Sequence, residues 1–165
     1  MGGFFQLKGQ EVNTSVERVY VVFKTHLDVG FTDLSSVVTQ RYITEFIPKA
    51  LDVSEKLRAE NASEKYVWTT GAWLIWKYLH TVSPQDVKRL EAAIRRGDIV
   101  WNSVPYTVES ESMNLDLFET CLLLSHKLDE KYGKKTIAAK MTDVPGHTRS
   151  IVAPMSRAGI RFLHI

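Results

Sequence analysis

The sequence predicts an α/β protein whose strands are mainly parallel. Short, β-branched apolar runs alternate with longer amphipathic segments along the chain, which is the order of a strand–helix–strand architecture. The apolar runs are nearly continuous, a pattern typical of strands that are buried on both faces of a parallel sheet. Glycines follow three of the amphipathic segments, at Gly97, Gly133 and Gly159, where helices commonly end.

Five strands are predicted, and helical segments follow each of the first four. The predicted strands are residues 18–24, 66–69, 99–101, 136–141 and 161–165. The predicted helices are residues 35–60, 71–79, 84–96, 115–131 and 149–158. Between the third strand and the fourth of these helices we expect a long polar loop over residues 102–114.

Apolar spacing and capping signals predict the helices. In the first helix Val38, Tyr42 and Phe46 share one face, and Pro48 is expected to kink or split it because proline lacks a backbone donor. Ser83, followed by a proline and then by an acid at the third helical position, indicates the start of the third helix. The fourth helix is expected to bury an apolar stripe made of Leu117, Phe118, Cys121, Leu124 and Leu128.

Composition excludes several classes of protein. The chain is 44% hydrophobic and 24% charged, which argues against disorder. Its 21 basic and 19 acidic residues give a net charge of +2, too little to indicate a nucleic acid or an anionic membrane as partner. The sequence also lacks the long apolar run of a membrane span. Its single cysteine, Cys121, excludes an internal disulfide and leaves the cellular compartment open.

The length of 165 residues is short for a complete barrel of alternating strands and helices, which typically needs about 250. We expect residues 1–17 to form a flexible leader and residues 18–165 to form one structural unit. The apolar strand predicted at 161–165 has no helix after it, so we expect the unit to be part of a larger fold. The alternative is a small α/β sandwich in which this strand pairs normally.

Two polar clusters follow predicted strands at their carboxyl ends, where parallel α/β sheets form their sites. His26 and Asp28 follow the first strand, and Asp143 follows the fourth. Alternation in an extended segment places His26 and Asp28 on the same side. One imidazole and two carboxylates suit a catalytic zinc site with an open position. The alternative is that Asp143, which precedes a Pro-Gly pair, only forms a turn.

The two clusters carry a resemblance to a known family. The stretch THLDVGF at residues 25–31 resembles the first signature of family 38 glycoside hydrolases, the zinc-dependent α-mannosidases. The stretch DVPGHT at residues 143–148 resembles the second signature of the same family. Trp68, Trp73 and Trp76 are similar to its aromatic-rich second unit, and residues 97–101 with Glu109 downstream are similar to its acidic-loop segment.

The resemblance implies a fold and a set of roles. The fold would be part of an incomplete (β/α)7-type barrel, with residues 18–165 as the N-terminal portion of a glycoside hydrolase catalytic domain. His26, Asp28 and Asp143 would be zinc ligands, and Asp143 would also be the nucleophile of a retaining enzyme. Phe31 and Glu109 would contact the carbohydrate substrate, an α-mannoside-like sugar. His147 would brace the turn rather than bind zinc.

The family's fourth zinc ligand, a histidine, and its acid/base carboxylate have no matching positions in this chain. The resemblance therefore implies that these groups come from the missing C-terminal part of the same protein. We expect the chain alone to have little or no glycosidase activity. Two other functions stay open from the residues: a metal-dependent carbohydrate deacetylase on a related barrel, and a non-catalytic sugar-binding or structural α/β domain.

Overall fold

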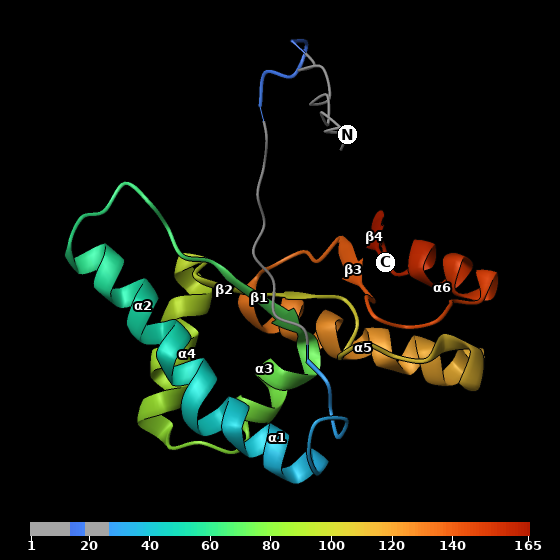
Figure 1. Ribbon diagram of the computed structural model, residues 1–165, viewed down its shortest axis with the longest axis horizontal. Coiled ribbons are helices and arrows are strands. Elements are labelled where there is room, and N and C mark those ends of the chain that lie inside the picture. Colours follow the sequence, from blue (N-terminus) through green and yellow to red (C-terminus); the bar gives the residue numbers. More distant parts are fainter. Residues whose placement is uncertain (1–13, 19–26) are drawn as a thin grey trace, which may run out of the picture.

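A computed structural model of the chain describes residues 14–18 and 27–165, in which helices alternate with four short strands (Figure 1). Strand β1 (Trp68–Gly71) pairs in parallel with β2 (Ile99–Asn102), and β3 (Ala138–Lys140) pairs in parallel with β4 (Phe162–His164). The prediction of an α/β protein with parallel strands is confirmed. The predicted strand at 18–24 lies outside the described residues except for Arg18, and so does most of the predicted leader at 1–17.

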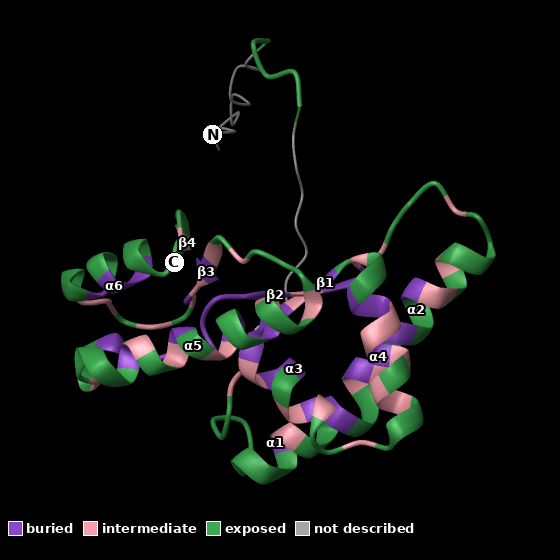
Figure 2. Cartoon of the chain, turned by 180° about the vertical axis from the view of Figure 1, so that it is seen from behind, coloured by how far each residue is buried: buried purple, intermediate pink, exposed green. Residues whose placement is uncertain are grey.

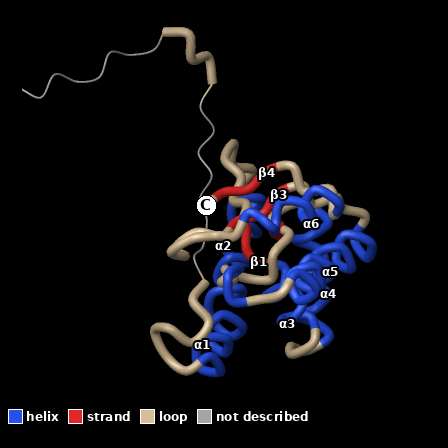
Figure 3. Tube along the Cα trace, turned by 90° about the vertical axis from the view of Figure 1, so that its right-hand side faces the viewer, coloured by secondary structure: helices blue, strands red, loops and turns tan. Residues whose placement is uncertain are grey.

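The two strand pairs are joined by the backbone. The Ser103 N–H, one residue beyond the end of β2, donates to the Ala138 carbonyl of β3 at 2.9 Å. The helices are α1 (Ser35–Arg41), α2 (Ile47–Ala59), α3 (Ala72–Leu79), α4 (Pro84–Arg96), α5 (Leu115–Tyr132) and α6 (Val152–Arg157), shown with the strands in Figure 3. Two 3-10 turns, Ser110–Ser112 and Arg149–Ile151, precede α5 and α6.

The first predicted helix is interrupted next to its proline, as expected. A π-helical segment, Tyr42–Phe46, separates α1 from α2, and Pro48 lies in the first turn of α2. Proline cannot donate to a preceding carbonyl, so the regular α pattern is interrupted before it. The capping prediction for α4 also holds, because the Asp86 N–H donates to the Ser83 hydroxyl at 3.2 Å and Gly97 ends the helix with φ +83°.

The buried face of α5 differs from the predicted stripe. Phe118, Leu122, Ser125 and Leu128 are buried, whereas the Leu117 side chain is half exposed. Leucines flank the buried stripe on both sides, so apolar spacing alone did not distinguish the face that packs from its neighbour. Contacts with α3 and α6 select the face.

Helix α5 contributes residues to two clusters of buried side chains. Figure 2 colours the buried residues of the chain purple. Leu128 belongs to the larger cluster, which is built mainly from β1, β2 and helices α1 to α4. Phe118 and Leu122 belong to the second cluster, together with Met141 after β3 and Met155 of α6. One continuous helix therefore holds the two strand pairs in a fixed relation.

The segment after β2 is a buried connection rather than the polar loop that the sequence predicted. Ser103, Val104 and Pro105 are buried, and their backbone lies against the start of α3. The Ala72 N–H donates to the Val104 carbonyl at 3.1 Å, and the Trp73 N–H donates to the Pro105 carbonyl at 3.2 Å. These bonds satisfy the free donors of a helix whose N-cap residue, a glycine, has no side chain to do so.

Asp98 ties the start of β2 to two helices. Its side chain is almost fully buried and pairs with Arg58 of α2 and Arg96 of α4, with the Arg96 Nε 2.9 Å from Oδ2. Burial alone raises the pKa of Asp98, but the hydrogen bonds and charges of the two guanidinium groups outweigh it, so the pKa lies below its ordinary value. Among the described residues, no helix is both long enough and apolar enough to cross a membrane.

We expect Gly71→Ala to destabilise the chain by at least about 3 kcal/mol, because overpacking against backbone cannot relax cheaply. A Cβ at position 71 would lie 2.1 Å from the Pro105 carbonyl oxygen. Gly97→Ala is the matched control, since its Cβ would meet nothing within 4 Å and only the positive φ opposes it. That control is expected to cost about 1 kcal/mol. Urea denaturation measures both, and equal costs would contradict the close approach at Gly71.

Asp98→Asn is expected to cost about 2 kcal/mol at pH 7, because two arginines lose a buried carboxylate partner. The pKa of Asp98 is lower in the folded chain than in the unfolded chain, so its contribution is complete above the unfolded pKa of about 4. The contribution is lost as the pH falls from there through the folded pKa. The difference between wild type and variant should therefore shrink in urea titrations at pH 3. Asp52→Asn removes an exposed partner of Arg89 and serves as the control, with an expected change below about 0.5 kcal/mol.

Candidate functional site

Residues 143–148 follow β3 and form a loop at the carboxyl end of that strand. Asp143 lies at the start of this loop, and its side chain is exposed. Its backbone has φ +66°, a left-handed conformation that aspartate adopts more readily than most side chains but that still costs energy. The loop therefore presents an exposed carboxylate at the carboxyl end of β3.

The loop is held by a second loop, the one that follows β2. The Ser110 hydroxyl lies 3.2 Å from His147 Nδ1 and accepts a hydrogen bond from the Thr148 N–H at 3.2 Å. His147 Nε2 lies 3.1 Å from the Met141 carbonyl oxygen. Ser110 is almost fully buried. The loops after two neighbouring strands therefore meet, as expected for a site at the carboxyl ends of parallel strands.

Two carboxylates flank the buried Ser110. Glu109 and Glu111 are both exposed, and Glu111 Oε1 is 3.8 Å from the position that a Cβ on Gly146 would occupy. Glu111 therefore lies beside the loop that carries Asp143. Glu109, predicted to bind substrate, precedes the same buried serine and lies on the same connection.

Asp28 lies beside the π-helical segment between α1 and α2. A cavity of about 180 Å³ is lined by Asp28, Thr32, Arg41 and Tyr42, among others. Burial and the negative charge of Asp28 together raise the pKa of the Tyr42 hydroxyl. Tyr42 is the first residue of the π segment, and such segments are frequent at functional sites.

The remaining predicted site residues differ in what the structure says of them. Phe31 lies in the bend before α1, and its ring is 87% exposed, so it is free to meet a ligand. His26 lies outside the described residues. Within residues 14–18 and 27–165, no group of three or more His, Cys, Asp or Glu side chains is arranged to hold a metal ion. Since the predicted zinc set includes His26, its assembly stays a prediction.

Sequence reasoning missed Ser110 and Ser103. Ser110 fixes the loop of Asp143, yet a serine between two glutamates in a polar stretch carries no pattern that predicts burial. Ser103 follows β2, is fully buried, and its hydroxyl has no hydrogen-bond partner in the described part of the chain. Its enclosure depends on the approach of β3 to the end of β2, where the Ser103 N–H donates to the Ala138 carbonyl. The sequence carries no sign of this contact.

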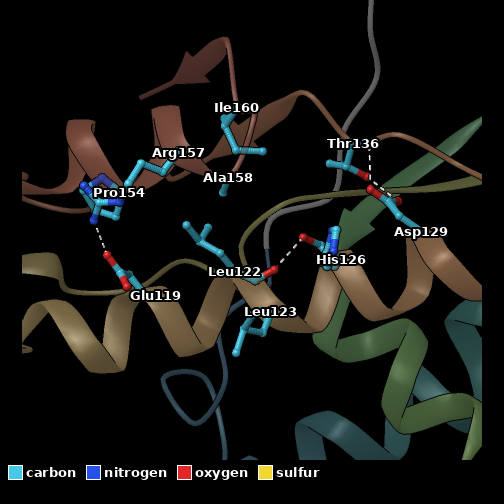
Figure 4. A pocket seen from close by; sticks show the side chains of 11 residues that line it. Glu119, Leu122, Leu123, His126, Asp129, Thr136, Pro154, Arg157, Ala158 and Ile160 are labelled. Atoms are coloured by element: carbon cyan, nitrogen blue, oxygen red, sulfur yellow. Dashed lines mark hydrogen bonds and ion pairs between the residues drawn. The ribbon is translucent and has the colours of Figure 1, made fainter.

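A larger cavity, of about 350 Å³, lies between α5 and α6 (Figure 4). Figure 4 shows Glu119 of α5 and Arg157 of α6 reaching toward each other, and they form an ion pair. Asp129 at the other end accepts hydrogen bonds from Trp101 Nε1 at 3.0 Å and from Thr136. None of the predicted site residues lines this cavity. It belongs to the helical layer rather than to the loops at the strand ends.

Comparisons with known proteins add no assignment. Neither models of known protein families nor curated protein sequences gave a match to this chain.

Replacing Ser103 by alanine is expected to leave the free energy of unfolding unchanged or to raise it by up to about 1 kcal/mol. The physical reason is that a buried hydroxyl without a partner costs desolvation energy, and alanine removes that cost. Ser125→Ala is the control, because its buried hydroxyl donates to the Leu122 carbonyl at 3.0 Å. Thermal denaturation compares the two variants. If Ser103→Ala instead lowers the free energy of unfolding by more than about 1 kcal/mol, the Ser103 hydroxyl has a hydrogen-bond partner.

Proposed function

We propose that the chain forms part of a metal-dependent retaining glycoside hydrolase that acts on an α-mannoside-like carbohydrate. The observation that carries the proposal is the pair of signature stretches at residues 25–31 and 143–148, together with the form of the second one. That stretch is a loop at the end of β3, with Asp143 exposed at its start. Ser110 of the connection after β2 contacts the far side of this loop, which supports the proposal that sites form where the loops after successive strands meet.

The finer fold that goes with this function is part of an incomplete (β/α)7-type barrel. The parallel pairs β1–β2 and β3–β4, with helices between successive strands, support it. In such a barrel the loops after successive strands line one end, and the contact between the loops after β2 and β3 agrees with that arrangement.

The donor set fits a zinc ion. His26, Asp28 and Asp143 would supply one imidazole nitrogen and two carboxylates, a combination that zinc accepts while leaving an open position. Asp28 follows the predicted strand at 18–24, and Asp143 follows β3. The Asp143 side chain is exposed to solvent, so a ligand can reach it. When bound, zinc would supply Lewis-acid chemistry and hold sugar hydroxyls.

Asp143 is the nucleophile in this proposal. One of its carboxylate oxygens forms a bond to the anomeric carbon while the bond from that carbon to the leaving oxygen breaks. The leaving oxygen needs a proton from an acid for which this chain has no matching position. Water later cleaves the ester to Asp143 and restores the carboxylate.

Two further residues contact the sugar in this proposal. The exposed Phe31 ring offers an apolar face on which a pyranose can stack. Glu109 is exposed next to the loop contact and accepts hydrogen bonds from sugar hydroxyls.

The proposal is tested by zinc binding to the chain itself. Isothermal titration of the metal-free chain should show one zinc site, and His26→Ala, Asp28→Asn and Asp143→Asn should each weaken it at least about 100-fold, since removing a ligand costs more than removing a group that only supports one. His126→Ala and Asp52→Asn are matched controls, because both side chains are exposed on helices. Adding a chelator should release the metal.

Two results would contradict the proposal. Absence of zinc binding by the wild-type chain would favour a non-catalytic sugar-binding domain. Zinc binding that survives Asp143→Asn but not His26→Ala would remove Asp143 from the site and with it the nucleophile. Turnover of an aryl α-mannoside by the 165-residue chain should be undetectable in the same preparation, and clear turnover would contradict the assignment of the acid to another part of the protein.

A further inference from the structure

We infer that Ser110 and His147 are positioning residues that fix Asp143, and that His147 is held in one tautomer that keeps it from binding the metal. The inference rests on the proposed function for its chemical meaning, and on the contacts among Ser110, His147, Thr148 and Met141 for its geometry. It assigns a role to Ser110, a residue outside both signature stretches.

The hydrogen-bond partners determine where the protons lie. A carbonyl oxygen can only accept, so the His147 nitrogen that faces Met141, Nε2, carries the proton and donates to it. In the neutral ring Nδ1 is then the acceptor, and the Ser110 hydroxyl donates to it. The same hydroxyl oxygen accepts from the Thr148 N–H. Nε2 of His147 is therefore a donor, Nδ1 is an acceptor, and the Ser110 hydroxyl both donates to Nδ1 and accepts from Thr148.

The contacts close the loop at both ends. Met141 precedes Asp143 by two residues, and His147 and Thr148 follow it by four and five. The bond from His147 to Met141 joins the two sides of the loop, while Ser110 anchors the far side to the buried connection after β2. Asp143 lies between these anchors with φ +66°. A left-handed backbone at a residue other than glycine costs energy, and these bonds brace the loop on both sides of Asp143.

The structure also distinguishes Ser110 from Ser112, the other serine of the same 3-10 turn. Ser110 is almost fully buried, whereas Ser112 is exposed and is held through its backbone N–H, which donates to the Glu109 carbonyl at 3.2 Å. Ser110→Ala and Ser112→Ala therefore remove the same atom from the same turn. Only Ser110→Ala should disturb the loop that contains Asp143.

The experiment is NMR of the metal-free chain. Long-range ¹H–¹⁵N spectra of the histidine rings should show His147 protonated at Nε2 and unprotonated at Nδ1. Ser110→Ala should speed amide exchange of Thr148 at least about tenfold, by removing its acceptor, and should shift the Asp143 resonances. Ser112→Ala should change neither. His147→Gln, which keeps a donor toward Met141 but loses the acceptor for Ser110, should give an intermediate exchange rate, so a second variant is available where Ser110→Ala does not fold.

Adding zinc then separates this inference from the proposed function. The His147 nitrogen shifts should stay where they are, while zinc affinity should fall about tenfold in Ser110→Ala, as for other groups that support a ligand. Protonation of His147 at Nδ1, unchanged Thr148 exchange in folded Ser110→Ala, or a shift of His147 on zinc addition would each overturn the inference. If the wild-type chain binds no zinc, the proposed function fails, and the tautomer and the exchange rates still decide the role of Ser110.

Discussion

The close approach of the Pro105 carbonyl to Gly71 is the constraint on which the rest of the candidate site depends. A side chain on residue 71 would occupy the space that the carbonyl fills. Without one, the connection after β2 lies against the start of α3 and accepts the hydrogen bonds of Ala72 and Trp73. Helix α3 needs these acceptors because its N-cap residue has no side chain. A single glycine therefore fixes both a helix start and the path of a loop.

The consequences extend along the connection toward Asp143. Tyr106, the next residue, packs edge-to-face on Trp73, with ring centroids 5.7 Å apart. From that point the chain passes the buried Val108 and reaches Ser110. Ser110 in turn bonds the far side of the loop that starts at Asp143. A disturbance at Gly71 would therefore reach the loop of Asp143 along the connection after β2 and through the Ser110 hydroxyl.

Apolar patterning and capping signals predicted the fold class and most elements. Ser83 and Gly97 mark the ends of α4 because their effects are local and need no knowledge of the rest of the chain. The face of α5 could not be predicted, since Leu117 and Leu122 are equally apolar and only contact with other helices distinguishes them. The burial of residues 103–105 was missed for a similar reason, because their backbone is buried by a partner 30 or so residues away in sequence, which apolar spacing does not record.

The candidate site shows the same division between local and distant information. Asp143 was predicted because it follows an apolar strand and lies in a stretch that resembles the family's second signature, both local features. Ser110 lies 33 residues earlier, and its bond to Thr148 exists only because the loops after β2 and β3 meet. His147 involves both kinds of information, local and distant. The resemblance of its stretch implies that it braces the turn rather than binds zinc, and both its ring nitrogens face partners within the protein. Binding a metal would require breaking one of those bonds, and the loop that presents Asp143 would lose the support that makes it useful.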